Sequence, residues 1–477
     1  MNRPVNPNDP LNAVAPLDAL AALWRYSHFP QAALAHAQLT GNDPVLPSSF
    51  AVGTAAQTSI AAAALAACEL GYLRGQRRRD VSVEMTHAAL ECSGWFSLNG
   101  HTPGLWDVFS GLYRAKDDWV RIHANFAHHR HGALRLLGLT PGTATRLDAQ
   151  TALGRWDALE FETAAAEAGL VVAAFRSFET WDTTAPGQCT AALPLIRIEQ
   201  IAEAAPLSLP TLAADALPLK GIRVLDLTRI LAGPVCGRTL AAHGADVMLV
   251  NAPHLPNIEA IADTSRGKWS CHADLRTPEG RAAVQHLLRD SHVFVQGYRP
   301  GGLAAMGFDA QQLALQRPGL VVVSLSAYGD EGPWGQRRGF DSLVQTTMGF
   351  NHAEMQAAKE DMPRPLPMQI LDFATGHLMA FAVASAVARQ QQVGGSWHVK
   401  VSLAQTGHWL RSLGRVAGGF GLTRPDPGAF LDCFASGFGE IRAYRHSAVM
   451  AGVNPSVQSA GHRRPSMPPG SHPPRWP

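Results

Sequence analysis

The stretch Pro365-Leu-Pro-Met-Gln-Ile-Leu-Asp-Phe-Ala-Thr-Gly-His-Leu378 places one carboxylate, Asp372, between an apolar loop and an Ala-rich run. Residues 379–388 are apolar on nearly every face, which predicts a buried helix. Asp372 then lies at the N-terminus of that helix, where free backbone N–H groups and the helix dipole favour an ionised carboxylate. Such a group is suited to act as a nucleophile or a base. The alternative is an ordinary N-cap, the more common role of an isolated Asp before a helix.

Composition limits the class of protein. The chain has 477 residues, enough for two or more domains, and 46% hydrophobic with 16% charged residues indicates a compact soluble protein. A formal net charge of +2 is too small to favour nucleic acid or a membrane surface as a partner. The six cysteines show no paired spacing, so we expect neither a zinc site nor a disulfide framework, and a cytoplasmic setting. Residues 1–10 lack the apolar core of a signal peptide, and no uninterrupted apolar run is long enough to span a bilayer.

A segment of the chain recurs at an offset of 318 residues, the difference between positions 380 and 62. Residues 62–66 align without a gap on 380–384, and 81–85 on 399–403. We therefore predict a partial internal duplication, each copy containing a long helix, a strand and a further helix. Asp372 falls opposite Thr54 in this alignment, and a hydroxyl without an evident base is a poor substitute for a carboxylate. The first copy is predicted to be catalytically silent.

The rest of the first half predicts a small α+β domain. Strands are expected at 119–122 and 170–175, with helical patterns at 130–138 and 146–168. The cluster His128-His-Arg-His131 could suggest a metal site, but no carboxylate or Cys with ligand spacing accompanies it, so a solvated loop is the better interpretation.

The second half begins as an α/β domain with a Rossmann-like parallel sheet. Buried strands are predicted at 222–227, 244–250, 292–296 and 320–325, with helices between them. Such sheets bind ligands beyond the carboxyl ends of their strands, which places the loops 228–232, 297–301 and 326–330 on one rim. Because no G-x-G-x-x-G follows the first strand, NAD chemistry is disfavoured.

Beyond this rim, Asp341 offers a second carboxylate, with Arg337 and Arg338 close by in sequence. The two arginines alone would be ordinary solvated loop residues.

The predicted organisation is an N-terminal segment (1–48), a truncated silent copy with the small α+β domain (49–205), a linker (206–219), a large domain with the candidate nucleophile (220–416), and a Pro/Gly-rich C-terminal segment (417–477). We expect the last of these to run over the surface in extended form.

The order and spacing of these motifs over about 218–410 resemble the class III CoA-transferase family, also called CaiB/BaiF. The family includes formyl-CoA and carnitine CoA-transferases, with α-methylacyl-CoA racemase as a relative. The matching stretches are Val224-Leu-Asp-Leu-Thr228, Ala232-Gly-Pro234, Gly244-Ala-Asp-Val247, Asp274-Leu-Arg-Thr-Pro-Glu-Gly280, Tyr298-Arg-Pro-Gly301, Gly339-Phe-Asp341 with Gln345, and Asp372 with its Ala-rich helix. The first half resembles the later part of the same fold, so the chain looks like a family member preceded by a truncated copy that lacks the nucleotide-binding segment.

The resemblance implies an acyl-CoA:carboxylate CoA-transferase. Asp372 would attack an acyl-CoA thioester to form a mixed anhydride, CoA thiolate would return to give an aspartyl-CoA thioester, and an acceptor acid would take over the CoA. Asp341 is the second candidate catalytic residue. Coenzyme A is then a substrate rather than a prosthetic group, and no metal or redox cofactor is needed. Residues implied to contact CoA are Arg229, Ile230, Leu231, Ala232, Tyr298, Met306 and Arg338.

Some positions depart from the family pattern. Asn251 and Gly297 stand where Glu and Asn are common, and Ala305 where a basic residue can occur. The glycine-rich loop that covers the aspartate in formyl-CoA transferase has only a faint candidate, residues 99–104. These losses bear on affinity and specificity more than on reaction class.

Two other functions compete with the transferase. A racemase would need a His–Asp pair, and Phe340 occupies the histidine's place, which disfavours that reaction. A non-catalytic paralogue or subunit that binds CoA esters is favoured by the silent first copy and the altered positions.

Family members form interlocked homodimers, so we expect a homodimer, although the first-half small domain could complete the second-half large domain within one chain. The sequence does not identify the acyl donor or the acid acceptor.

Overall fold

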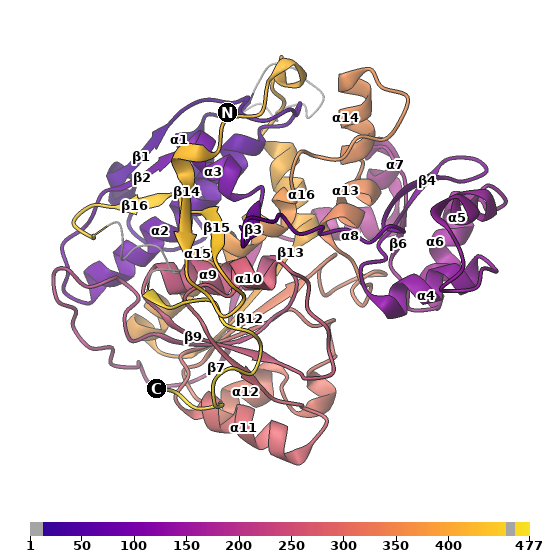
Figure 1. Cartoon of the computed structure of the whole chain (residues 1–477). Helices are drawn as coiled ribbons and strands as arrows, with labels where there is room; N and C mark the ends of the chain where they lie inside the picture. Colours follow the sequence, from indigo (N-terminus) through magenta and orange to yellow (C-terminus); the bar gives the residue numbers. More distant parts are fainter. Residues whose placement is uncertain (1–12, 455–462) are drawn as a thin grey trace.

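A seven-stranded sheet forms the centre of the computed structural model, which describes residues 13–454 and 463–477 (Figure 1). The strand order is β10-β9-β8-β11-β12-β13-β7, and all neighbours are parallel except β7, which is antiparallel to β13. The strands are β7 (Ile196–Ala202), β8 (Arg223–Leu227), β9 (Asp246–Asn251), β10 (Trp269–His272), β11 (Val293–Gln296), β12 (Val321–Ser326) and β13 (Ser396–Ser402). The predicted α/β class with a parallel sheet is confirmed. Residues 1–10, assessed above for a signal peptide, lie outside the described part.

Helices cover both faces of this sheet. One face packs against α9 (Ala232–Ala242) and α15 (Ile370–Val393), with α2 (Val52–Leu73) packed against α15, and the other face packs against α11 (Pro278–Arg289) and α12 (Ala310–Gln316). Side chains alternate between the faces, so that Val224 and Val293 point to α9 and α15 whereas Leu225 and Phe294 point to α11 and α12. This two-sided burial explains the continuous apolar runs of the strands.

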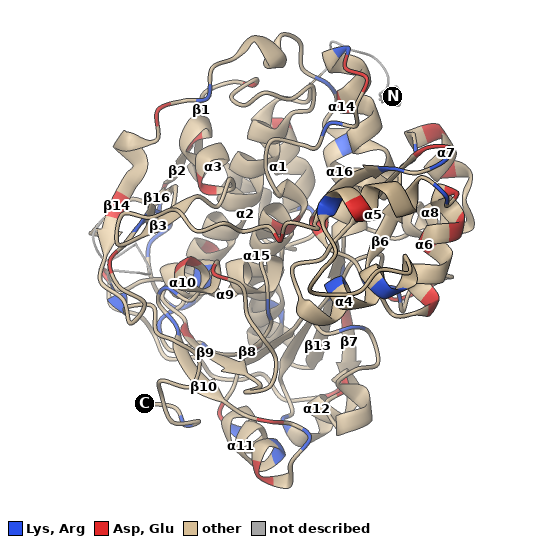
Figure 2. Ribbon diagram, turned by 45° about the vertical axis from the view of Figure 1, so that its right-hand side comes forward, with Lys and Arg blue, Asp and Glu red and all other residues tan. Residues whose placement is uncertain are grey.

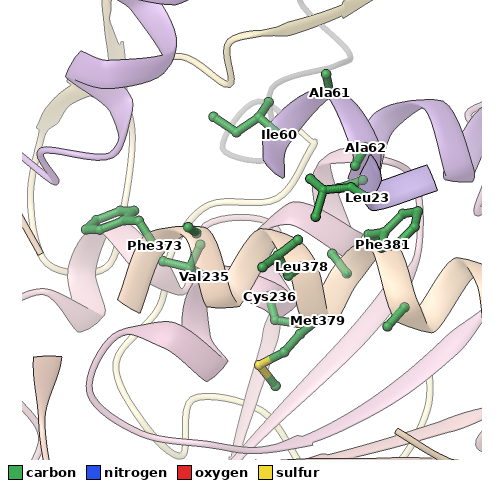
Figure 3. Close-up of a cluster of buried hydrophobic side chains, with 14 of the residues drawn as sticks. Leu23, Ile60, Ala61, Ala62, Val235, Cys236, Phe373, Leu378, Met379 and Phe381 are labelled. Atoms are coloured by element: carbon green, nitrogen blue, oxygen red, sulfur yellow. The ribbon is translucent and has the colours of Figure 1, made fainter. Parts of the chain in front are cut away.

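The predicted buried helix is α15, which lies between α2 and α9. Figure 3 shows the apolar cluster where Val235 and Cys236 of α9 lie beside Phe373 and Leu378 of α15. By length and composition α15 could cross a membrane, contrary to the expectation from its sequence, but 94% of its apolar window is buried inside the protein. Its many alanines let the neighbouring helices approach closely, as a core helix requires.

The predicted offset of 318 residues recurs in the helix boundaries. α2 begins at Val52 and α15 at Ile370, and α3 (Met85–Glu91) and α16 (Leu403–Ser412) are displaced by the same number. β2 (Val81–Glu84) lies between parallel β1 (Ala37–Thr40) and antiparallel β16 (Ala448–Met450), just as β13 lies between parallel β12 and antiparallel β7. The two regions therefore share a local arrangement, while their origin by duplication remains a prediction.

The small α+β unit consists of an antiparallel sheet of β4 (Gly111–Arg114), β5 (Trp119–Ile122) and β6 (Val172–Ala174) with α4 (Ala127–Leu136), α5 (Arg146–Leu153) and α6 (Ala158–Glu167). The long helical pattern at 146–168 is broken at Gly154 into α5 and α6. The histidine cluster is not a solvated loop, because it forms the first turns of α4 and His129 is buried.

The segment after residue 417 differs from the expected extended surface chain. β14 (Leu431–Phe434) and β15 (Ile441–Tyr444) form a sheet with β3 (Phe96–Leu98), and β16 extends the sheet of β1 and β2. Residues 463–477 carry no strand, and the Trp476 indole donates to the Leu287 carbonyl at 2.9 Å. Short strands of three or four residues surrounded by Gly and Pro give too little periodicity for recognition from sequence.

The remaining elements complete the shell around the core. They are α1 (Pro16–Trp24), α7 (Phe178–Thr183), α8 (Ala185–Ala192), α10 (Ile261–Thr264), α13 (Asp341–Met348) and α14 (Phe350–Ala358), with short 3-10 helices at Gln31–His36, Ala304–Met306, Gly419–Gly421 and Gly428–Phe430. Figure 2 shows basic and acidic residues interspersed along the ribbon, as expected for a formal net charge of +2.

Candidate active site

Asp372 lies in the first turn of α15, as predicted, and is 9% exposed. It is not the N-cap, because that position is Gln369 and the helix begins at Ile370. Its backbone N–H donates to Oδ2 of Asp341 at 2.9 Å. The main chain of the candidate nucleophile is therefore held by the second predicted carboxylate.

Asp341 begins α13 and is fully buried behind Asp372. Its Oδ1 accepts a hydrogen bond from Nε2 of Gln345, whose own Oε1 accepts from the Leu366 backbone at 3.0 Å. The structure thus brings together two carboxylates that are 31 positions apart in the chain. Gln345 fixes the orientation of Asp341 from the next turn of the same helix.

The electrostatics of this pair contradict the expectation that Asp372 is ionised. Burial raises the pKa of Asp341 to about 7. Burial and the neighbouring Asp341 raise the pKa of Asp372 well above its usual range, and the backbone N–H of Ala232 offsets this only in part. The helix dipole is worth at most ~2 kcal/mol, too little to outweigh the desolvation of two adjacent acids. Burial therefore favours the protonated form of Asp372, against the ionised form expected from the helix N-terminus.

Asp372 opens into a cavity of about 350 Å³ at the carboxyl end of the parallel sheet. The loops that follow β8, β11 and β12 line it, which confirms the rim expected from the strand order. Of the residues predicted to contact CoA, the cavity is lined by Arg229, Ile230, Leu231, Ala232, Tyr298 and Arg338.

Met306 is not among the lining residues of this cavity. It ends the 3-10 turn Ala304–Met306 and packs, partly buried, against the apolar cluster under α11 and α12. The left-handed Gly307 (φ 87°) that follows closes this turn. Met306 thus contributes to the core of the opposite face.

The small α+β unit supplies a wall of the cavity that sequence reasoning missed. Phe126, His128 and His129 line it beside Phe340. The His123 ring stacks on Phe340 with 3.8 Å between ring centroids. Burial lowers the pKa of both His123 and His129 to about 3, so both rings are neutral. The histidine run was visible in the sequence, but its burial depends on contacts between the two halves of the chain.

Arginines give this cavity a positive lining. Arg337 is compensated, because it lies 3.3 Å from Glu162 and 3.7 Å from the centroid of the Trp334 ring. Arg338 donates instead to the Gly169 carbonyl at 3.0 Å, and within the described residues it has no carboxylate at ion-pair distance. Burial, followed by the charge of Arg299, lowers the pKa of Arg338. A guanidinium in this setting is suited to bind phosphate or carboxylate oxygens.

One further sequence candidate, the possible covering loop at residues 99–104, lies elsewhere. Residues 99–104 do not line the cavity. Asn99 is tied instead to Glu440, whose carbonyl accepts from the Asn99 N–H at 2.8 Å. Over residues 13–454 and 463–477, no three His, Cys, Asp or Glu side chains are grouped to hold a metal ion.

The doubly covered parallel sheet thus holds a buried carboxylate pair, of which Asp372 opens into the cavity at the carboxyl rim. Residues 219–417 match the family model described as CoA-transferase family III.

The chain is similar to an acyl-CoA transferase of Gibberella moniliformis, with 32% identity over 322 residues that cover 65% of this chain and 53% of the relative. It is also similar to a succinate–glutarate CoA-transferase of Agrobacterium fabrum, with 34% identity over 205 residues, 39% of this chain and 51% of the relative. A solved hypothetical protein, Rv3272, of Mycobacterium tuberculosis is 30% identical over 49% of this chain and 66% of that chain, with a TM-score of 0.38. The chain spans about half the length of the curated relatives it matches.

Proposed function

We propose that this protein is an acyl-CoA:carboxylate CoA-transferase that acts through a covalent aspartyl-CoA thioester on Asp372. The observation that carries the proposal is the position of Asp372, which is buried in the first turn of α15 and reaches a cavity lined by the sheet's carboxyl-end loops. Arg229 and Arg338 in the same lining suit the phosphates of a CoA ester. The family match and the names of the relatives support the same reaction class.

In the proposed reaction, an ionised Asp372 oxygen attacks the thioester carbonyl carbon, the C–S bond breaks, and CoA thiolate leaves a mixed anhydride. The thiolate then attacks the aspartyl carbonyl carbon, which releases the donor acid and leaves an aspartyl-CoA thioester. The acceptor carboxylate completes the transfer by the reverse steps. Asp341, with its pKa raised to about 7 by burial, can take the proton that Asp372 must lose.

Only the second copy of the helix carries this chemistry in our proposal. At the position equivalent to Asp372, the Thr54 hydroxyl donates to Oδ2 of Asp43 at 2.8 Å, and the Thr54 N–H donates to the same oxygen at 2.7 Å. Asp43 therefore caps α2 and leaves no free carboxylate at Thr54. One reactive aspartate per chain follows.

Intact-mass measurement after incubation with a panel of acyl-CoAs, with hydroxylamine trapping, tests the proposal. Wild type is expected to gain an acyl or CoA adduct that Asp372→Ala lacks. Asp43→Asn is the matched control, because Asp43 is a partly buried carboxylate that accepts hydrogen bonds from the first turn of the companion helix, and it should keep the adduct. Absence of an adduct with every ester that binds would refute the nucleophile assignment.

A second candidate is a non-catalytic protein that binds CoA esters or partners an active subunit. The features that favour it are the raised pKa of Asp372, which disfavours the ionised nucleophile, and the altered Asn251 and Gly297. Calorimetric binding of acyl-CoA without turnover or adduct would support it. A racemase is less favoured, since Phe340 stacks on His123 where a catalytic histidine would be required.

We further propose a cytoplasmic homodimer that uses an acyl-CoA donor and a carboxylic acid acceptor. All six cysteines are free, which suits a reducing compartment. β7 follows the small α+β unit yet pairs with β13 of the second half, so one chain already joins the two halves. Light scattering coupled to size exclusion will distinguish a dimer from a monomer, and cell fractionation will test the compartment.

A further inference from the structure

A fully buried ion pair lies beneath the first loop of the cavity. Lys268 and Asp226 are both 0% exposed, and Nζ of Lys268 lies 2.9 Å from Oδ2 of Asp226. The ammonium also donates to the Pro234 carbonyl at 2.8 Å. Buried ion pairs add little net stability, because desolvation offsets their attraction. Stabilisation of the core is therefore not a sufficient explanation for this pair.

The other oxygen of Asp226 connects the ion pair to the loop after β8. Oδ1 accepts from the Thr228 hydroxyl at 2.5 Å and from the Thr228 N–H at 3.1 Å. Thr228 is buried and directly precedes Arg229, the first residue of this loop that lines the cavity. Lys268 thus fixes Asp226, and Asp226 fixes the start of the loop.

The loop held in this way is strained. Ile230 has a φ of 76°, in the left-handed region that a β-branched side chain rarely adopts. Such conformations persist only where surrounding contacts impose them, and they gather at functional sites. Two residues later the chain enters α9 at Ala232, which lines the same cavity as Asp372 and whose backbone N–H lowers the pKa of that carboxyl group.

Three glycines make room for this arrangement. A Cβ on Gly237 would lie 2.4 Å from Oδ2 of Asp226 and 2.6 Å from Nζ of Lys268, and a Cβ on Gly233 would lie 2.4 Å from the Cβ of Thr228. On the other side, a Cβ on Gly376, one turn after Asp372, would lie 2.5 Å from the Ala232 carbonyl oxygen. The Lys268–Asp226 pair therefore packs closely against α9 and the loop before it, and these in turn pack closely against α15.

We propose that Lys268, Asp226 and Thr228 are positioning residues that hold the strained Ile230 turn so that Ala232 stays beside Asp372 in the cavity lining. This inference rests on the proposed function. The Ala232 N–H favours the ionised, nucleophilic form of a carboxyl group whose pKa is raised by burial. Loss of this alignment leaves Asp372 in place but makes it harder to ionise.

The test compares Thr228→Val with wild type by the pH dependence of kcat for CoA transfer. Valine keeps the shape of threonine and removes the hydroxyl that donates to Asp226. We expect kcat to fall about tenfold and the acidic limb of the pH profile to move upward by about one unit, the size of a lost hydrogen bond to a charged group. KM for the acyl-CoA should change less than kcat. Thr228→Ser restores the donor and should recover the wild-type profile.

Thr58→Val is the matched control, since the Thr58 hydroxyl is also buried but bonds only the Thr54 carbonyl of α2. It should leave kcat and the pH profile unchanged. An unshifted profile in Thr228→Val, or a shift that Thr228→Ser fails to reverse, would overturn the positioning role. If wild type forms no adduct on Asp372 at all, the proposed function fails instead, and the two failures are distinguished by wild type alone.

Discussion

Replacement of Asp372 by Asn should stabilise the folded protein, by an amount that grows with pH. In an unfolded chain Asp372 ionises near its ordinary pKa of 3.8, whereas in the folded protein burial and Asp341 raise the pKa far above that value. Asp372 shares the burial of Asp341 and additionally meets its charge, and both effects favour the protonated carboxyl group in the folded protein. As pH rises above the ordinary pKa, the unfolded state therefore releases a proton that the folded state retains. Each pH unit over which this holds costs wild type about 1.4 kcal/mol that the uncharged variant does not lose.

The assay is thermal unfolding of wild type and Asp372→Asn from pH 4 to pH 7.5. The melting temperatures should nearly coincide at pH 4 and diverge by a few degrees as the pH rises to 7, with the variant higher. Glu91→Gln is a control for which we expect the opposite change in melting temperature. Burial alone would raise the pKa of Glu91, but His446 and Arg238 outweigh it and hold the pKa well below its usual range. Its replacement should lower the melting temperature at neutral pH and have less effect in acid. A melting difference for Asp372→Asn that is independent of pH would refute the reasoning.

Other expected results follow from the cavity and its surroundings. Arg338→Ala should raise the Kd for acyl-CoA about 10- to 100-fold by loss of a charge-assisted bond, measured by calorimetry, whereas Arg337→Ala should act mainly on the melting temperature because Arg337 is paired with Glu162. Acyl-CoA binding should weaken as salt increases, and salt-independent binding would contradict a phosphate role for the arginines. Gly237→Ala should destabilise the protein by about 1–3 kcal/mol despite the better helix propensity of Ala, because its Cβ would meet the Asp226–Lys268 pair. Gly154→Ala has no backbone or side-chain atom nearer than 3.5 Å to the added Cβ and should be close to neutral in the same melt.

The strands and helices with strong periodicity could be predicted from sequence. The apolar runs of β8, β9, β11 and β12 lie within a few residues of the predicted ranges, and α15 (Ile370–Val393) contains the predicted residues 379–388 but begins earlier. Because the carboxyl ends of parallel strands meet on one rim, the loop residues Arg229 and Tyr298 could be placed together from the strand pattern alone. Local pattern and a general rule of sheet topology were sufficient here.

The ionisation of Asp372 could not be predicted in the same way. A helix N-terminus is visible in sequence and favours an anion, but the opposing effects come from the burial of Asp372 and its contact with Asp341. Neither the depth of burial nor the contact between residues of two helices has a local signal. The histidines of α4 show the same limitation, since a run of polar residues indicated a solvent-exposed loop whereas the fold buries His129.

The sequence by itself determined the type and order of the main elements, the parallel sheet, the 318-residue recurrence and the residue types available for chemistry, because these depend on periodicity and spacing along the chain. Only the tertiary structure decided which of those residues share a cavity, that Met306 lies in the opposite core, that the small unit supplies Phe126 and that the C-terminal segment joins strands of the first half. These outcomes depend on desolvation and packing between segments far apart in the chain. Their free energies arise from surfaces that exist only after the chain has folded.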